Sequence, residues 1–105
     1  MRVDVALRAL VEPRRREILA LVRDRELSSG EIAGHFPVTP AAISQHLGVL
    51  RGAGLVEERR SGTRRLYRAR REGLREVREY LDSMWADGLD RLRVHAEREE
   101  RTRRG

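Results

Sequence analysis

The sequence contains no cysteine and no lysine, and aromatic residues make up only 4% of its 105 residues. The absence of cysteine excludes disulfide bonds, thiolate metal ligands and redox sensing by cysteine. No apolar run approaches the length of a membrane-spanning helix, and no signal-peptide pattern opens the chain. These absences predict a soluble, cytoplasmic protein with no membrane partner, and nothing in the sequence indicates a cofactor.

The composition suits one small domain with a strongly charged surface. Hydrophobic residues make up 39% of the chain and charged residues 38%, which is too apolar for a disordered protein. The net charge of +6 makes polyanions the first partners to consider. All 23 basic residues are arginine, which codon bias in a GC-rich genome explains as well as function does. The positions of the arginines are therefore more informative than their number.

Helical periodicity and capping residues predict three helices in the first third of the chain. Apolar residues at three- and four-residue spacing mark a helix over residues 3–11, and Pro13 fits the first position of a second helix. Ser28 and Glu31 have the spacing of a capping box, which starts a third, short helix that runs through Phe36.

The remainder of the chain predicts a fourth helix, a hairpin and a long final helix. Thr39 and Pro40 start the fourth helix, and glycines at 52 and 54 end it. Residues 55–60 and 63–69 fit two short strands joined at Ser61-Gly62. We predict a mainly α winged helix-turn-helix domain over residues 1–96, in the order α-α-α-α-β-β-α, and a charged, disordered tail over residues 97–105.

The fourth predicted helix has one apolar face and one small, polar face. Steps of 100° per residue place three apolar residues on the inner side: Ile43, Leu47 and Leu50. The same steps place four small or polar residues on the outer side: Ala41, Ser44, Gln45 and Gly48. Small residues let a backbone approach a DNA groove, and Ser44 and Gln45 can form hydrogen bonds with base edges. We therefore predict that this helix contacts DNA.

Three further residues of this helix are candidate DNA contacts: Thr39, His46 and Arg51. His46 falls beside the apolar stripe, so a structural role is an equally good interpretation. Arg51 could reach a phosphate or could simply favour the C-terminal end of the helix.

The predicted hairpin carries a concentrated positive charge. Residues 55–69 hold five arginines and two glutamates, so half of the net charge lies in this segment. Four arginines flank the turn: Arg59, Arg60, Arg64 and Arg65. A basic hairpin can lie along the phosphate backbone or enter a narrow minor groove. Charge also protects edge strands from pairing, but that role does not favour one sign, so we predict DNA contact.

A second cluster, Arg14 to Arg16, lies where the second helix begins. The helix dipole disfavours cations at that position. Either Glu12 and Glu17 offset the arginines or a phosphate lies nearby, and the sequence slightly favours the offset.

These segments together resemble the ArsR-type winged-helix repressors over residues 3–92. The resemblance is carried by four segments: ALRALVEPRRREIL (6–19), LSSGEIAGHF (27–36), TPAAISQHLGVLRGAGLV (39–56) and RRSGTRRLYR (59–68). It implies a homodimer that binds a roughly palindromic operator in double-stranded DNA and blocks transcription. It also implies dimer contacts through the first and last helices.

The apolar stripe on the last predicted helix supports dimerisation independently, because it is larger than a small monomer easily covers. The predicted interface residues are Val3, Leu7, Tyr80, Leu81, Met84, Trp85, Leu89 and Leu92. Part of the stripe, such as Leu74 and Val77, can instead belong to the core of the monomer.

The sequence differs from the metal-sensing members of this family. Those members carry a cysteine pair in the third helix, where this chain has Glu26 to Gly30. Members of the family also often have lysine where this chain has Gly48. The chain therefore resembles the metal-independent autorepressors more closely, and we expect no metal site. On the last helix only acidic residues and His95, one turn from Glu99, could hold a metal.

Two alternatives stay open on the sequence alone. One is a metal-gated sensor of the same fold with ligands on the last helix, and the other is a protein-interaction module that does not bind DNA. An enzyme is not expected, because no nucleophile–base pair or phosphate-binding glycine loop stands out. The sequence does not indicate an effector.

Overall fold

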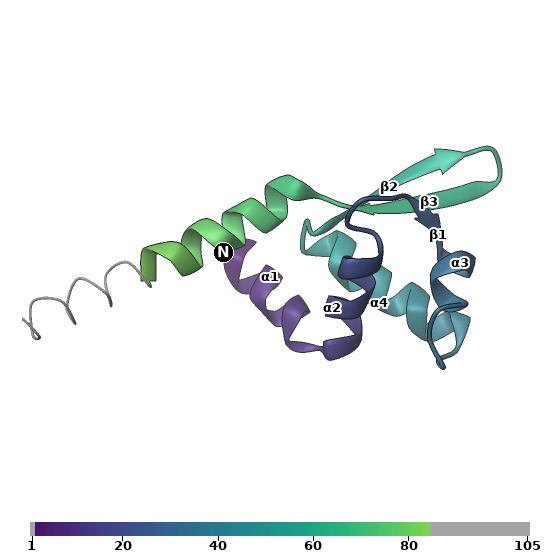
Figure 1. Ribbon diagram of the computed structural model, residues 1–105, viewed down its shortest axis with the longest axis horizontal. Coiled ribbons are helices and arrows are strands. Elements are labelled where there is room, and N and C mark those ends of the chain that lie inside the picture. The colour runs from purple at the N-terminus through teal and green to yellow at the C-terminus, as the bar shows by residue number, and fades with distance from the viewer. Residues whose placement is uncertain (1, 85–105) are drawn as a thin grey trace, which may run out of the picture.

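A computed structural model describes residues 2–84, and apart from one short strand its helices and strands follow the predicted order (Figure 1). Four helices come first: α1 (Arg2–Val11), α2 (Pro13–Leu21), α3 (Ser29–Ala33) and α4 (Pro40–Gly52). Three antiparallel strands, β1 (Leu27–Ser28), β2 (Val56–Ser61) and β3 (Arg64–Ala69), form a sheet in the order β1-β3-β2. Residues 71–84 form a further helix. The predicted winged helix-turn-helix is confirmed over this range, and the predicted tail lies outside it.

Local side-chain caps start the helices at the positions that the sequence predicts. Pro13 occupies the first turn of α2. The Ser28 hydroxyl accepts from the Glu31 N–H at 3.1 Å, and the Glu31 carboxylate accepts from the Ser28 N–H at 3.1 Å. The Thr39 hydroxyl accepts from the Ala42 N–H at 3.1 Å at the start of α4. These bonds satisfy backbone donors that have no partner inside a helix, so they fix where α3 and α4 begin.

Two predicted boundaries were wrong. The helix α3 ends at Ala33 instead of Phe36, because the N–H groups of His35 and Phe36 bond carbonyls three residues back and the chain tightens out of α-helical geometry. The hairpin turn lies at Gly62-Thr63, one residue later than predicted, and Gly62 supplies a φ of 64° that favours glycine.

The strand β1 was not predicted at all. It consists of two residues, Leu27 and Ser28, which pair with Tyr67 and Leu66 of β3. This short strand joins the hairpin to the helix-turn-helix, so the sheet has three strands instead of two.

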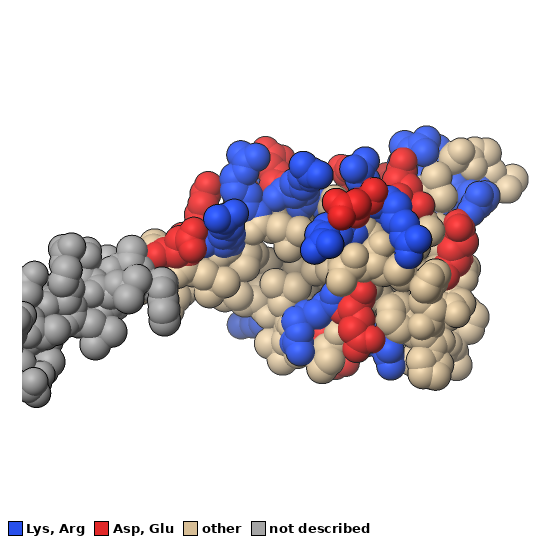
Figure 2. Space-filling view, in the orientation of Figure 1, with Lys and Arg blue, Asp and Glu red and all other residues tan. Residues whose placement is uncertain are grey.

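A single apolar core joins the helices to the sheet. Its most deeply buried large side chains are Ile18, Val22, Ile32, Ile43, Leu47, Leu50 and Leu55. Among residues 2–84 the buried set contains no charged or polar residue, and the charged side chains lie on the surface (Figure 2). The helix α4 contributes three core residues, so its orientation is fixed from within the domain.

The arginines at the start of α2 stabilise the end of α1. Arg16 donates to the carbonyl of Leu10 at 2.7 Å. Arg15 donates to the carbonyl of Arg8, in the last turn of α1, at 3.4 Å. Arg14 pairs with Glu17 at 3.1 Å. Offset by Glu17 is therefore observed for Arg14, whereas Arg15 and Arg16 place their charges at the negative end of α1. Sequence reasoning considered only neighbouring acids and phosphate.

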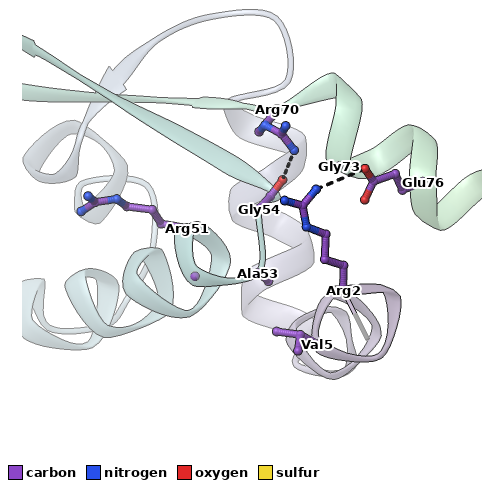
Figure 3. Close-up of a pocket in the computed structure, with 9 residues that line it drawn as sticks. Arg2, Val5, Arg51, Ala53, Gly54, Arg70, Gly73 and Glu76 are labelled. Carbon is purple, nitrogen blue, oxygen red and sulfur yellow. Dashed lines mark hydrogen bonds and ion pairs between the residues drawn. The ribbon is translucent and has the colours of Figure 1, made fainter.

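The helix over residues 71–84 begins against the turn that follows α4. The Arg70 N–H donates to the carbonyl of Leu55 at 2.8 Å, and its guanidinium donates to the carbonyl of Gly54 at 3.4 Å (Figure 3). Gly73 is buried against this turn. The turn leaves no room for a side chain, since a Cβ at this position would lie 2.0 Å from the Gly54 oxygen. After Val77, which is buried, the helix leaves the core (Figure 1).

Candidate nucleic-acid interface

The outer face of α4 is exposed as the sequence predicts. Its inner residues, Ile43, Leu47 and Leu50, are at most 1% exposed. The predicted outer residues Ala41, Ser44, Gln45 and Gly48 are all exposed, and so is Thr39. We call these five residues the reading face. The core holds α4 by its opposite side, so the reading face is presented to solvent without internal partners for Ser44 or Gln45 within residues 2–84.

The reading face belongs to a segment of the chain that has no formal charge. Residues 32–50 contain no arginine, lysine, aspartate or glutamate. Figure 2 shows the corresponding surface, over α3 and α4, almost free of charged side chains. The segment itself presents no acid to a polyanion and offers hydrogen bonding and close contact. Two arginines of α2 border it, Arg14 at Phe36 and Arg15 at His46.

The hairpin of β2 and β3, which we call the wing, divides the four predicted arginines between its two faces. In its register, Arg60 lies opposite Arg65, Arg59 opposite Leu66, and Ser61 opposite Arg64. Because side chains alternate along a strand, Arg60 and Arg65 share the face of the buried Tyr67. Arg59 and Arg64 lie on the other face.

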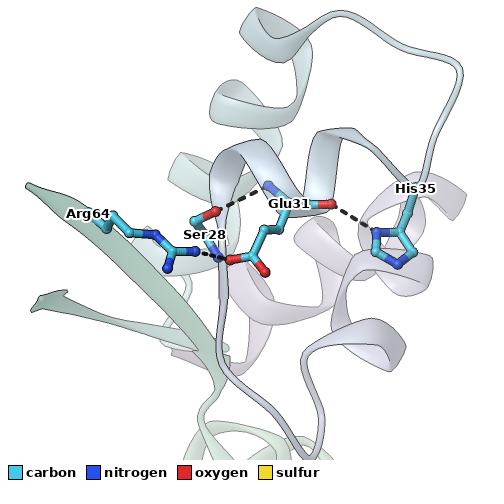
Figure 4. A network of polar contacts seen from close by, with 4 residues as sticks. All are labelled: Ser28, Glu31, His35 and Arg64. Atoms are coloured by element: carbon cyan, nitrogen blue, oxygen red, sulfur yellow. Dashed lines mark hydrogen bonds and ion pairs between the residues drawn. The ribbon is translucent and has the colours of Figure 1, made fainter.

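The second face of the wing is already neutralised by acids of the helix-turn-helix. The Arg59 guanidinium makes a two-pronged pair with Glu26, at 2.9 and 3.2 Å, and Arg64 pairs with Glu31 (Figure 4). The hydrogen bond from Arg59 lowers the pKa of Glu26, and the Ser28 backbone N–H is the main cause that lowers the pKa of Glu31. Both acids stay ionised at neutral pH, so the charges of Arg59 and Arg64 are already balanced by a carboxylate within the domain.

The face of the wing that carries Tyr67 also holds Arg60 and Arg65, and acids balance this positive charge only in part. Arg60 and Arg65 are directly opposed across the ladder, and like charges at such positions destabilise a hairpin. Within residues 2–84 Arg60 makes no ion pair, and Arg65 reaches only Glu58, at 3.5 Å. An anion between the two arginines would remove their repulsion, so this pair is suited to bind phosphate.

Two predicted contacts of α4 point elsewhere in the structure. Arg51 donates to the Glu58 carboxylate of β2 at 2.9 Å. His46 is half-buried, and its Nδ1 lies 3.4 Å from the Arg15 guanidinium of α2. Direct DNA contact by Arg51 and His46 stays a prediction, but neither side chain belongs to the reading face.

Sequence reasoning missed three acids and one apolar residue near this surface. The acids Glu26, Glu31 and Glu58 each hold an arginine that was predicted to contact DNA. No local signal links the first two pairs, because 33 residues separate their members. Val49 is exposed beside the reading face, and its helical angle next to Gln45 could have indicated this.

Three of the residues predicted at the dimer interface are exposed within the described part of the chain. Tyr80, Leu81 and Met84 are between 40% and 57% exposed, whereas Val3 and Leu7 of α1 are half-buried. Val11 is 74% exposed and was not predicted. The remaining predicted interface residues, Trp85, Leu89 and Leu92, lie outside the described residues.

Ligand sites are few in the described part of the chain. Residues 2–84 contain no group of three His, Asp or Glu side chains placed to hold a metal ion, and His95 and Glu99 lie outside this range. A cavity of about 420 Å³ lies between α1, the end of α4 and Gly73 (Figure 3). Its arginines are already paired: Arg2 with Glu76, Arg51 with Glu58 and Arg70 with Glu72. This cavity therefore gives no indication of an effector.

The family of bacterial regulatory proteins described as the arsR family matches residues 12–58, which include α2, α3, α4 and the start of the wing. The HTH-type transcriptional regulator Rv2034 of Mycobacterium tuberculosis is 42% identical over 82% of this chain and 80% of its own length. This chain belongs to the ArsR family. It is therefore a transcriptional regulator, and the winged helix-turn-helix is its DNA-binding domain.

Two further relatives extend the comparison. The transcriptional repressor SdpR of Bacillus subtilis is 36% identical over 52% of this chain and 61% of its own length. The homodimeric winged helix-turn-helix DNA-binding domain of Mb0332 from Mycobacterium bovis, described as a possible ArsR-family regulator, is 33% identical with a TM-score of 0.67. That similarity covers 82% of this chain and 79% of the solved domain. The relatives are regulators and not enzymes. Within residues 2–84 no helix has the length and apolar character needed to cross a membrane.

Proposed function

We propose that this regulator is a homodimeric repressor in which α4 reads bases in the major groove while the wing binds phosphates. The observation that carries the proposal is the contrast between the two surfaces. The reading face is exposed and uncharged, whereas Arg60 and Arg65 are opposed on the adjacent wing. Ser44 and Gln45 would form hydrogen bonds with base edges, with Gln suited to adenine. Arg60 and Arg65 would supply affinity through contacts to phosphates.

Dimerisation would set the spacing of the two reading helices. A two-fold axis through α1 and the last helix would pair the exposed Tyr80, Leu81 and Met84 of two copies. Such a dimer would place its two α4 helices about 34 Å apart, one turn of DNA, so the operator would be roughly palindromic. Occupation of an operator at a promoter would exclude RNA polymerase, and the relative SdpR is a repressor by name. The regulator would act in the cytoplasm, where bacterial DNA lies.

The salt dependence of binding tests the role of the wing. The operator is first selected from random duplexes with the purified protein, and binding is then titrated against NaCl by fluorescence anisotropy. Arg60→Gln should make the slope of log K against log salt shallower by about 0.9 for each phosphate that is no longer neutralised, or about 2 for a dimer. Affinity should fall on operator and random DNA alike.

The matched control is Arg59→Gln, which removes the same charge from the next residue. Arg59 is held by Glu26 on the other face, so its loss should change the slope much less. Equal changes for the two variants would contradict the proposed division of the wing. A wild-type protein whose binding does not respond to salt would contradict the phosphate role altogether.

Gly48 tests how closely α4 approaches DNA. A Cβ at Gly48 meets no atom within 4 Å inside the protein, so internal packing does not require glycine there. Gly48→Ala should raise the free energy of unfolding by about 0.5–1 kcal/mol. It should nevertheless weaken operator binding, because the added methyl group would hold the backbone away from the groove. Urea unfolding and anisotropy measure the two effects.

Gly52→Ala is the control at the end of the same helix, where a Cβ also meets nothing within 4 Å. It should leave operator affinity unchanged. Undiminished operator binding by Gly48→Ala would show that the glycine is merely tolerated.

A further inference from the structure

We infer that Glu58 is a positioning residue for specificity: its carboxylate links Arg51, at the end of the reading helix, to Arg65 on the wing, so that it competes with phosphate on random DNA and holds both arginines in one geometry on the operator. This inference rests on the proposed role of the wing. It assigns a function to a negatively charged residue of the wing, whose arginines would attract DNA.

The geometry places Glu58 between two arginines from different elements. One carboxylate oxygen lies 2.9 Å from Nη1 of Arg51, in the last turn of α4, and the other lies 3.5 Å from Nε of Arg65, on β3. The Glu58 side chain is only 17% exposed, whereas both arginine side chains are about 60% exposed. The carboxylate is therefore the fixed member of the group, and the arginines are the members that can reach outward.

The surroundings of Glu58 hold the carboxylate in place. Glu58 lies opposite Tyr67 in the ladder, and both face the domain. As directly opposed residues of the ladder, Glu58 and Tyr67 lie side by side. Burial raises the pKa of the Tyr67 phenol, and the negative charge of Glu58 raises it further. A rigid strand residue that bridges α4 and β3 couples the orientation of the helix to that of the wing.

The other two acids near the wing do not make the same link. Glu26 precedes β1 and Glu31 lies in α3, and their partners Arg59 and Arg64 are on the face turned away from Tyr67. Among the described ion pairs, only the Glu58 group includes a residue of the reading helix.

A bridging acid affects random DNA and operator DNA differently. On random DNA, where α4 is not seated, Glu58 competes with phosphate for Arg51 and Arg65 and so weakens binding. On the operator, the same bridge holds the two arginines in one geometry, which lowers the entropy cost of binding. Specificity is the ratio of the two affinities, so both effects increase it.

The test compares Glu58→Gln with Glu57→Gln in the full-length chain. Both variants remove one negative charge, and the residues are adjacent on β2, but Glu57 is exposed on the opposite face and within residues 2–84 makes no ion pair. Affinities for the selected operator and for a random duplex of equal length are measured by fluorescence anisotropy at about 50 to 300 mM NaCl. Binding through phosphate contacts depends steeply on salt in this range.

Glu57→Gln should raise both affinities by the same small factor, about twofold, and leave their ratio unchanged. Glu58→Gln should raise the affinity for random DNA by about five- to thirtyfold, because one arginine in each protomer gains a phosphate. Its slope on random DNA should steepen by about 2, and the ratio of operator to random affinity should fall by about tenfold. Equal effects of the two variants would overturn the inference.

Arg51→Gln breaks the same link from an exposed position and serves if Glu58→Gln fails to fold. If Glu58 acts by positioning, Arg51→Gln should lower operator affinity more than random affinity, so the ratio of the two falls. A uniform loss on both DNAs would mark Arg51 as a simple phosphate contact and overturn the inference. A wild-type protein that binds no DNA would instead overturn the proposed function itself.

Discussion

Replacement of both Ser44 and Gln45 by alanine is expected to abolish the preference for the operator while leaving weak, salt-sensitive binding to any duplex. These two side chains carry most of the hydrogen-bonding capacity of the reading face, because Ala41 and Gly48 have none and the Thr39 hydroxyl already accepts the Ala42 N–H. Glutamine can bond both N6 and N7 of adenine, which distinguishes the base pair in the major groove.

The expected size of this effect follows from the two-fold symmetry of the proposed dimer. One good base contact discriminates by about 1–3 kcal/mol, and a dimer uses each contact twice. The ratio of operator to random affinity should therefore fall on the order of a hundredfold or more, since 1.4 kcal/mol is about a tenfold change. The phosphate contacts of the wing are unchanged, so the salt slope on random DNA should stay that of the wild type.

A double substitution in the wing provides the control. Ser61 and Thr63 are also exposed, polar and close to the arginines of the wing, but they lie on either side of Gly62 at the tip of the hairpin. Their joint replacement by alanine should leave operator preference nearly intact, because contacts to the backbone carry little sequence information. If the Ser44/Gln45 variant keeps its full preference, the base-reading role assigned to α4 is wrong.

The parts of this domain that sequence reasoning predicted are those determined within one or two helical turns. The capping box of Ser28 and Glu31 and the cap at Thr39 depend on residues three apart, and both are present in the structure. The two faces of α4 follow from periodicity alone, and the burial of Ile43 and the exposure of Ser44 confirm them.

The parts that sequence reasoning missed depend on contacts between distant segments. A two-residue strand such as β1 shows no alternation, so only its pairing with β3 defines it. The carboxylates that hold Arg59 and Arg64 lie 33 residues away in sequence. The sequence shows four arginines around a turn, but strand register decides that two of them face helix-turn-helix acids and two face each other.

An added methyl group at Gly73 should have the opposite effect on stability to one at Gly48. A glycine inside a helix is normally less stable than alanine by about 0.5–1 kcal/mol. At Gly73 a Cβ would lie 2.0 Å from the carbonyl oxygen of Gly54 and 3.0 Å from its carbon. These are backbone atoms in a turn where Gly54 has a φ of 73°, so no flexible side chain can move aside. Overpacking of this kind typically costs about 1–3 kcal/mol, which exceeds the gain in helix propensity.

Gly73→Ala should therefore lower the melting temperature by about 4–8 °C for each kcal/mol of destabilisation, measured by circular dichroism. Gly52→Ala, whose Cβ meets open space, should raise it slightly. A thermal stability of Gly73→Ala equal to that of the wild type would contradict the close approach.

The same contact fixes where residues 71–84 leave the core, since Arg70 binds Leu55 and Gly54 beside it. If the helix is displaced, Tyr80 and Leu81 move relative to α4, so in a dimer built on these residues the two reading faces would no longer match the spacing of the operator.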